Sequence, residues 1–557
     1  MGEPAQGRSA DSTGEARARR IVQRAAGWIR SPACLSALVA VIAAVVLWLV
    51  IQPLARATAD TDAAASVMYF DRIVHGHRLE AFFPPTPKPL LTLVYGLAWS
   101  LTHDWHSLAV MTLMVGALGV GLAARLAARL GGIAAAAFVA IGLVAWPTFR
   151  LETADANSFV WGLALWLLAG VLITAERPRP WLAGLALLLA GLARTETAWL
   201  VAAAACCAAV VVIRARRTGD RSQLRLILPL LIGVLAVPLA CLHDLLLSGR
   251  PFYWLSVPGG YTALTYPNLA SVSPLTVLHE QAVHYRPLLA LMLVAAVGIA
   301  WLASTRWRPV SFALVAFTGG VLLTLVGLGW RGIYISERYY EESDAAILLA
   351  AAVGGGLLVR RVLDWTGNRM AGRGAGARAG SRPWLRQAAL GGVAALLALG
   401  VAWQVVPQAG VEALLARSAQ ADVALRAAEP QLAAIVAGAD GATLTVSGVS
   451  YPVSDPRACR AFVPRSLLPR ISVDTGAPTP VLGDSFLAFR DGDYSVLSPG
   501  QWVLHIAAGD GSGGVFAPFE HSVPTTLTVK TGVALTILPV FVDEQMGVWL
   551  LRVDAAG

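Results

Sequence analysis

The sequence predicts a mainly α-helical, polytopic membrane protein with about eleven transmembrane helices, followed by a small β-rich domain. Hydrophobic residues make up 56% of the 557 residues and charged residues only 14%, whereas soluble domains carry about 25% charged residues. The apolar residues gather in runs of helix length, and arginines gather in the short polar segments between these runs. Together these observations exclude a soluble globular protein.

Candidate transmembrane helices are the long apolar runs, because about 20 apolar residues cross the hydrocarbon core of a bilayer. They lie at 33–51, 106–124, 131–147, 157–175, 180–193, 197–213, 225–247, 287–304, 309–329, 344–359 and 387–406. The first run follows several arginines and resembles a signal peptide, but it is long and many spans follow, so we interpret it as an uncleaved helix. The apolar piece at 89–101 is too short to span and is expected on the membrane surface.

The arginines predict the topology, since cytoplasmic loops are enriched in Lys and Arg. With the N-terminus inside, arginine-rich loops alternate with mixed or acidic loops along the chain. This alternation requires the stretch around Arg194 and Glu196 to be two helices with a polar turn between them, because a single helix would place the next arginine-rich loops outside. The polar turn is then extracytoplasmic.

Three regions follow from this topology in the plasma membrane. They are a cytoplasmic N-terminal segment at 1–32, a transmembrane domain at 33–407 and an extracytoplasmic C-terminal domain at 408–557. In the last region, residues 410–436 have an amphipathic helical pattern, and short alternating runs such as "QWVLHIAAG", "TTLTVKTG" and "GVWLLRVDA" indicate strands.

Candidate functional residues collect in the predicted extracytoplasmic loops. The first loop holds Asp60 and Asp62 just after the first helix, and Lys88 in a proline-rich stretch. Two carboxylates at the membrane edge could act as a general base or hold a cation. Alternatively, they could simply cap the helix that follows.

The second and third loops add both signs of charge. The second contains Glu152 and Asp155, although Asp155 or Asn157 could serve only as the N-cap of the next helix. The third is the turn with Arg194 and Glu196.

The fifth loop contains Arg338 and Tyr339 at the start of a late helix, where they could bind a phosphate or anchor the helix at the headgroups. Arginine forks hold phosphate groups well, and a carboxylate can take the proton from an incoming hydroxyl. Carboxylates and arginines on one membrane face are therefore what a reaction on a lipid-linked anionic donor requires.

Two other classes are disfavoured. The net charge of +9 does not indicate nucleic-acid binding, because no basic stripe is interleaved with stacking aromatic residues. The five cysteines show neither a disulfide framework nor the spacing of metal ligands.

Four sequence motifs stand out in chain order: Asp62 followed by Gly76 and "TPKPLLTLVYG", then "LETADANSF", "GLARTETAWL" and "ISERYYEESDAAILLAAA". They resemble motifs of the GT-C superfamily of integral membrane glycosyltransferases, the protein mannosyltransferase and aminoarabinose transferase type. The resemblance covers roughly residues 35–360. It departs from the superfamily pattern at Ala63, where many relatives have an acidic residue, and in "KPL" and "RTE", where they have "KPPL" and "RPE".

The resemblance implies an inverting transfer of a sugar, a hexose or a pentose, from a polyprenyl-phosphate donor to an extracytoplasmic hydroxyl of a glycan, lipid or protein. Asp62 or Asp60 would be the general base, and Arg194, Arg338 and Lys88 would bind the donor phosphate. Orientation of the substrates would fall to Glu152, Asp155, Glu196 and Tyr339.

The departures leave open whether a divalent cation is needed. They also leave an alternative function, a non-catalytic membrane scaffold of the same architecture that presents the C-terminal domain.

Overall fold

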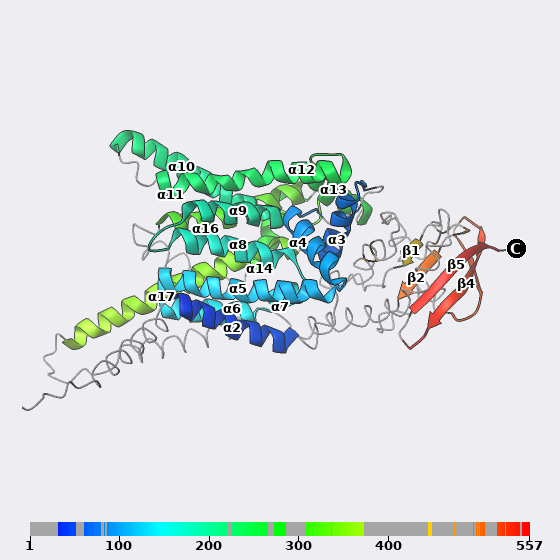
Figure 1. The fold of residues 1–557 in the computed structure, drawn as a ribbon, viewed down its shortest axis with the longest axis horizontal. Helices are drawn as coiled ribbons and strands as arrows, with labels where there is room; N and C mark the ends of the chain where they lie inside the picture. The colour runs from blue at the N-terminus through cyan, green and yellow to red at the C-terminus, as the bar shows by residue number, and fades with distance from the viewer. Residues whose placement is uncertain are drawn as a thin grey trace, which may run out of the picture.

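The protein is a helical bundle with a small sheet near the C-terminus (Figure 1). The computed structural model describes residues 32–51, 61–79, 83, 86–219, 224–265, 272–285, 308–335, 337–371, 444–447, 470, 473, 494, 497, 499–500, 502–506, 521–529, 531–545 and 548–556. The predicted transmembrane runs at 287–304 and 387–406, and the predicted helix at 410–436, lie outside these residues.

Most of the described helices follow the predicted apolar runs. In chain order they are α2 (Pro32–Ile51), α3 (Thr61–Val74), α4 (Pro89–Thr102), α5 (His106–Gly131), α6 (Ile133–Ala145), α7 (Pro147–Ala154), α8 (Ser158–Ile173), α9 (Pro180–Ala193), α10 (Ala198–Thr218), α11 (Leu224–Ile227), α12 (Ala236–Ser248), α13 (Tyr253–Thr265), α14 (Pro274–Tyr285), α16 (Arg308–Trp330) and α17 (Glu341–Ala371). Three short 3₁₀ segments complete the order: η1 (Thr195–Thr197), η2 (Leu228–Leu235) and η4 (Glu337–Tyr339).

Four described helical segments are long and apolar enough to cross a membrane. They are His106–Gly131, Thr195–Thr218, Leu224–Ser248 and Glu341–Arg361. The helices α6 and α7 would make a fifth span together, but they are bent by 60°, because Pro147 disfavours helical geometry at the residue before it. The predicted count of eleven spans therefore stays a prediction.

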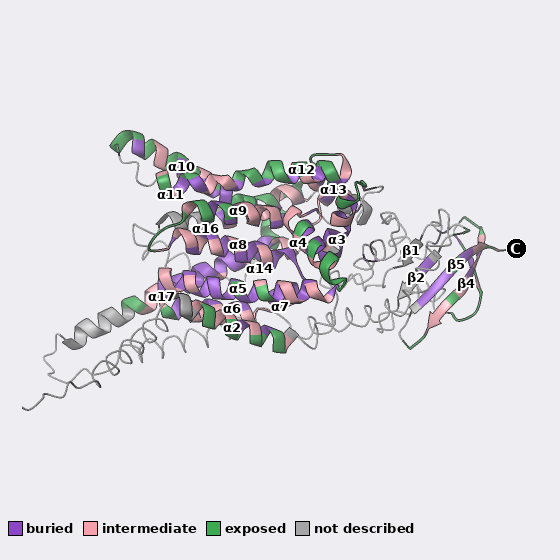
Figure 2. Ribbon diagram, in the orientation of Figure 1, coloured by how far each residue is buried: buried purple, intermediate pink, exposed green. Residues whose placement is uncertain are grey.

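The core of the bundle lies along α5, α8 and α17, while α10 and α12 expose apolar side chains (Figure 2). Exposed apolar surface on long helices is typical of segments that face lipid. Small residues let the central helices approach closely: a Cβ atom added to Gly356 of α17 would lie 2.4 Å from the carbonyl oxygen of Gly131 of α5. The contact between α5 and α17 therefore requires glycine.

The two ends of the bundle carry different groups. At one end, Arg129 near the end of α5 donates a hydrogen bond to the carbonyl of Val171 near the end of α8, at 2.7 Å. At the opposite end, the turn between α9 and α10 contacts the start of α17 and approaches α8. The loops predicted to share the extracytoplasmic face thus meet at one end, and the orientation of that end in the membrane stays a prediction.

The short helices α3 and α4 pack together at this second end. Ala63, Val67, Leu91 and Tyr95 form an apolar cluster between them. The side chain of Tyr95 also donates to the carbonyl of Ala156, at 2.8 Å, in the turn between α7 and α8. This bond attaches the pair to the bundle. Burial of Ala63 also gives a packing reason why no acidic residue follows Asp62.

The connection at 248–286, which none of the predicted apolar runs covers, contains the helices α13 and α14, a difference from the sequence prediction. Asp244 explains part of this difference, because its carboxylate accepts a hydrogen bond from the backbone N–H of Trp254 at 2.7 Å. A buried acidic side chain on α12 thus stabilises the first turn of α13, a contact that local pattern does not reveal.

The C-terminal strands form a five-stranded sheet in the order β1-β2-β5-β4-β3. Their bounds are β1 (Leu444–Ser447), β2 (Trp502–Ile506), β3 (Thr525–Thr528), β4 (Ala534–Asp543) and β5 (Val548–Ala555). Strand β1 pairs in parallel with β2, and the other pairs are antiparallel. The strands predicted from alternating runs are present, together with β4, which was not predicted.

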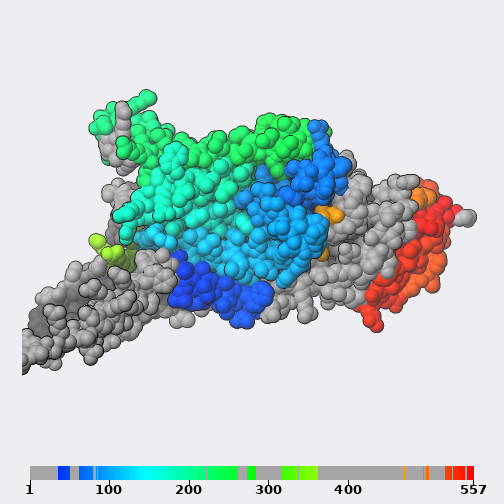
Figure 3. Space-filling view, viewed as in Figure 1, coloured from blue at the N-terminus to red at the C-terminus, as the bar shows by residue number. Residues whose placement is uncertain are grey.

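The sheet lies beyond the end of the bundle that carries α3 and α4 (Figure 3). Between them, the guanidinium of Arg470 lies over the ring of Trp105, 5.1 Å from its centroid. The C-terminal part of the chain thus reaches the same end of the bundle as the predicted site residues.

Candidate functional site

Asp62 lies in the first turn of α3, and its carboxylate pairs with Lys88, the residue directly before α4. Pro89 begins α4 and keeps Lys88 in extended geometry, which directs its side chain back toward α3. Both side chains are only 13% exposed. The first loop therefore forms an ion pair rather than two separate charges.

Burial alone would raise the pKa of Asp62, but the nearby positive charges of Lys88, Arg338 and Arg194 outweigh it and hold this pKa below its usual range. Asp62 is thus ionised at neutral pH. The influence of both arginines also indicates that residues far apart in sequence are brought near one carboxylate.

Arg194 lies where the chain breaks between α9 and η1, and its backbone is extended. The two-helix interpretation of this stretch therefore agrees with the described helices. The side chain of Arg194 is buried among carboxylates: Glu341 Oε2 lies 3.3 Å from its Nη1, and Glu196 Oε2 lies 3.5 Å from its Nε. A buried cation needs such partners, because leaving it unpaired costs several kcal/mol, of order 3–5.

Arg338 is more accessible than Arg194. It lies in η4, its side chain is 28% exposed, and its Nη2 lies 3.4 Å from the carboxylate of Glu152 on α7. Glu152 itself is 1% exposed. A buried carboxylate therefore holds an arginine whose other edge can reach a ligand.

Two carboxylates that the sequence reasoning did not select are central to the cluster. Glu341 and Glu342, in the first turn of α17, are 1% and 0% exposed. Glu342 accepts a hydrogen bond from Trp166 Nε1 at 2.9 Å. The sequence "RYYEESD" shows two adjacent acidic residues at the start of an apolar helix, but exposed acidic residues are also common there because they favour the helix dipole.

Other residues predicted for the site have structural contacts or lie outside the described residues. Asn157 is the N-cap of α8, since its side chain accepts from the N–H of Phe159, whereas Asp155 ends α7. Tyr339 packs against the apolar core. Asp60 lies outside the described residues. No group of three or more His, Cys, Asp or Glu side chains placed to hold a metal ion occurs in the described part of the chain.

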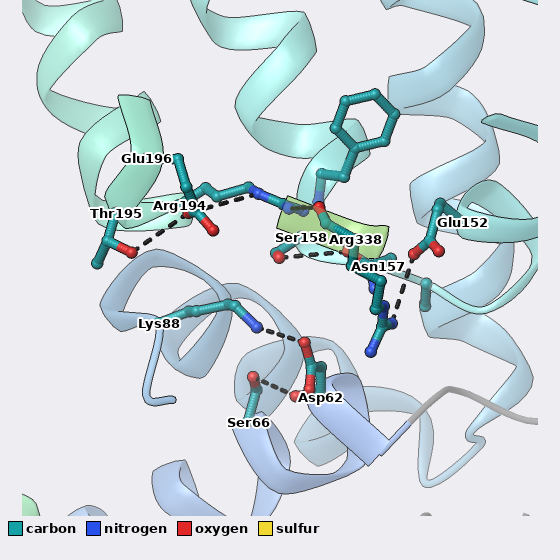
Figure 4. Close-up of polar contacts among 12 residues, drawn as sticks. Asp62, Ser66, Lys88, Glu152, Asn157, Ser158, Arg194, Thr195, Glu196 and Arg338 are labelled. Atoms are coloured by element: carbon teal, nitrogen blue, oxygen red, sulfur yellow. Dashed lines mark hydrogen bonds and ion pairs between the residues drawn. The ribbon is translucent and has the colours of Figure 1, made fainter. Parts of the chain in front are cut away.

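Figure 4 shows the side chains of Asp62, Lys88 and Arg338 directed toward one region, with Glu152 behind Arg338 and Arg194 beside it. One ionised carboxylate and two partly accessible cations thus meet at the end of the bundle. Such a set can bind an anionic group and accept a proton from a neighbouring hydroxyl.

The arrangement of the helices has a counterpart among solved structures. No protein-family model and no curated protein sequence matches this chain. A solved structure does: ArnT from Cupriavidus metallidurans, bound to undecaprenyl phosphate, is 14% identical with a TM-score of 0.50, and the match covers 94% of this chain and 98% of that one. The resemblance to GT-C proteins is thereby confirmed as a likeness of fold.

A second solved structure is more distant. It is the oligosaccharyltransferase of Archaeoglobus fulgidus with a tethered acceptor peptide, which is 14% identical with a TM-score of 0.44. The match covers 79% of this chain and 64% of that one, so less than two thirds of the longer protein is matched.

Proposed function

We propose that this protein is an inverting glycosyltransferase that moves a sugar from a polyprenyl-phosphate donor to an acceptor hydroxyl. The observation that carries this proposal is the meeting of Asp62, Lys88 and Arg338 at one end of a bundle with the fold of ArnT. ArnT was solved with undecaprenyl phosphate bound, which supports a lipid-linked phosphate donor here.

The proposed step is a single displacement. The acceptor oxygen attacks the anomeric carbon, the bond from that carbon to the phosphate oxygen breaks, and the leaving polyprenyl phosphate keeps the bonding electrons. Asp62 takes the acceptor proton and later releases it to water. A positioned base of this kind contributes about 10²- to 10⁴-fold in rate. Asp60 is the alternative base.

Lys88 and Arg338 would bind the phosphate, since both are cations with some exposure near Asp62. Capture of the phosphate by Lys88 would also loosen its pairing with Asp62, which must be free to accept a proton. Arg194 would not contact the phosphate directly, because its side chain is enclosed by carboxylates. It would contribute only a nearby positive charge.

The remaining acidic groups would orient these cations and the substrates. Glu152 would hold Arg338, and Glu196 would hold Arg194. Asp155, in the turn beside Asn157, and Tyr339, next to Arg338, would border the sugar. A metal requirement is left open, and no step is assigned to a metal.

The site would face the outside of the cell, with 1–32 cytoplasmic, 33–407 in the membrane and 408–557 extracytoplasmic. The C-terminal domain would then hold the acceptor. Cysteine labelling tests this topology: Thr195→Cys should react with impermeant reagents from outside and Arg216→Cys only from inside. Labelling of position 195 from the cytoplasm alone would reverse the orientation.

The proposed activity is tested by comparing lipid-linked and envelope glycans in cells with and without the gene. Loss of one sugar, restored by the wild-type gene and not by Asp62→Asn, is the expected result. An unchanged glycan profile would instead favour the non-catalytic scaffold, which the departures at Ala63 and in "KPL" and "RTE" motivate.

A further inference from the structure

A cluster of buried polar side chains contacts the turn that carries Arg338, and these side chains have no direct part in the proposed transfer. Its acidic members are Glu341 and Glu342, which are adjacent in the first turn of α17. Both are almost completely buried, and Glu342 is fully inaccessible. A buried carboxylate is destabilising unless hydrogen bonds and a counter-charge satisfy it.

Glu342 is contacted from α8 and from the turn between α9 and η1. Trp166 of α8 donates its indole N–H to Glu342 Oε2 at 2.9 Å, and Arg194 Nε lies 3.8 Å from Oε1. Glu341 accepts from Arg194 Nη1 at 3.3 Å. The two carboxylates and the indole thus fix the Arg194 guanidinium, whose position also places it 5.6 Å from the ring centroid of Phe159.

The fixed guanidinium reaches the turn that carries Arg338. Arg194 Nη2 donates to the backbone carbonyl of Arg338 at 2.6 Å, the shortest of its hydrogen bonds in the described residues. From this anchored backbone the Arg338 side chain extends to Glu152. A continuous path therefore connects Glu342, through Arg194, to the position of Arg338.

We propose that Glu342 is a positioning residue, which with Trp166 fixes Arg194 so that Arg194 anchors the Arg338 turn and directs the Arg338 guanidinium toward the donor phosphate. This inference rests on the proposed function for the identity of the ligand. The mechanical link between Glu342 and Arg338 is independent of the proposed function.

Gly162 on α8 supports the proposal independently. A Cβ atom at this position would lie 2.9 Å from Glu342 Oε1 and 3.3 Å from Arg194 Cβ. Real Cβ atoms essentially never approach below 3.0 Å, so α8 leaves room for this carboxylate only because residue 162 is glycine. Gly162→Ala should displace Glu342 without removing a charged group.

The main test is a double-mutant cycle on polyprenyl-phosphate binding, with the non-phosphorylated polyprenol as reference ligand. Arg338→Gln should weaken phosphate binding about ten- to hundredfold, as expected for loss of a charge-assisted hydrogen bond. Glu342→Gln should weaken it about three- to tenfold in the wild-type background and not at all in the Arg338→Gln background, because it acts through Arg338. Polyprenol binding should not change.

A second readout needs no donor. Phenylglyoxal modification of Arg338, followed by mass spectrometry, should be faster in Glu342→Gln and Gly162→Ala, because the turn is no longer anchored. Gly119→Ala is the matched control, since a Cβ atom there would have its nearest neighbour at 3.5 Å, an ordinary contact. If Glu342→Gln does not fold, Trp166→Phe, which removes the indole hydrogen bond and keeps an aromatic ring, takes its place.

The outcomes separate the two proposals. Absence of phosphate-dependent binding in the wild type would contradict the proposed function, while the labelling would still decide the role of Glu342. Equal labelling of Arg338 in all variants, or an equal binding loss from Glu342→Gln in both backgrounds, would overturn the positioning role.

Discussion

Two charged groups meet at the candidate site and differ in how completely they are enclosed. The pair of Asp62 and Lys88 joins two short helices and keeps some exposure, whereas Arg194 lies among Glu196, Glu341 and Glu342 inside the bundle. An enclosed cation has its hydrogen-bonding capacity taken by the protein, and an exposed one can exchange a protein partner for a ligand. In the proposed function, the first group would carry the chemistry and the second group would support it.

The largest effect should come from removing the base. Asp62→Asn keeps the size of the side chain but removes the proton acceptor, so transfer should fall by about 10²- to 10⁴-fold with little change in thermal stability. The measurement is the transfer rate of purified protein in nanodiscs. Asp60→Asn tests the alternative base, and normal transfer by both single variants and the double variant would exclude a first-loop base.

A different kind of loss is expected at Arg194. Arg194→Gln leaves buried carboxylates without their counter-charge, which should lower the free energy of unfolding by about 3–5 kcal/mol. Arg194→Lys should be intermediate, because an ammonium cannot reproduce the planar fork. Thermal unfolding in nanodiscs measures this. Stability equal to wild type in both variants would mean that Arg194 only marks the helix turn.

Lys88→Met should change the pH dependence of the transfer rate, because Lys88 is the ion-pair partner of Asp62. In the wild type, positive charge lowers the pKa of Asp62 against the effect of burial, so the carboxylate stays ionised, and its ion pair is lost only as pH falls through this lowered pKa. Without Lys88 that pKa rises, and the acidic limb of the transfer rate at saturating donor should move to higher pH. If the acidic limb of the pH profile does not move in Lys88→Met, then Asp62 is not the group whose protonation lowers the transfer rate.

The smallest effect is expected at Glu196, which is more exposed than Glu341 or Glu342. Glu196→Gln removes one of several acidic partners of Arg194, and partly exposed ion pairs contribute about 0–1 kcal/mol. Donor affinity should therefore fall by less than about fivefold. A loss of unfolding free energy in Glu196→Gln as large as that in Arg194→Gln would show that Glu196, and not α17, holds the arginine.

Much of the site could be found from sequence because its members lie where polar residues interrupt apolar runs. Asp62, Glu152, Arg194 and Arg338 were selected in this way, and the described structure brings them to one end of the bundle. Glu342 was not selected, because the cost of a buried charge is a property of the packed bundle. A charged residue at a helix start has the same local pattern whether it faces water or another helix.

The sequence by itself determined the positions of the long apolar helices, the break at Arg194 and most of the strands of the C-terminal sheet, because helix length, hydropathy and side-chain period are local properties. Only the tertiary structure decided which charges are paired. Trp166 and Glu342 are 176 positions apart, and Arg194 and Glu341 are 147 apart. Electrostatic and hydrogen-bond energies depend on distance in space and on burial, and neither can be read from separation along the chain.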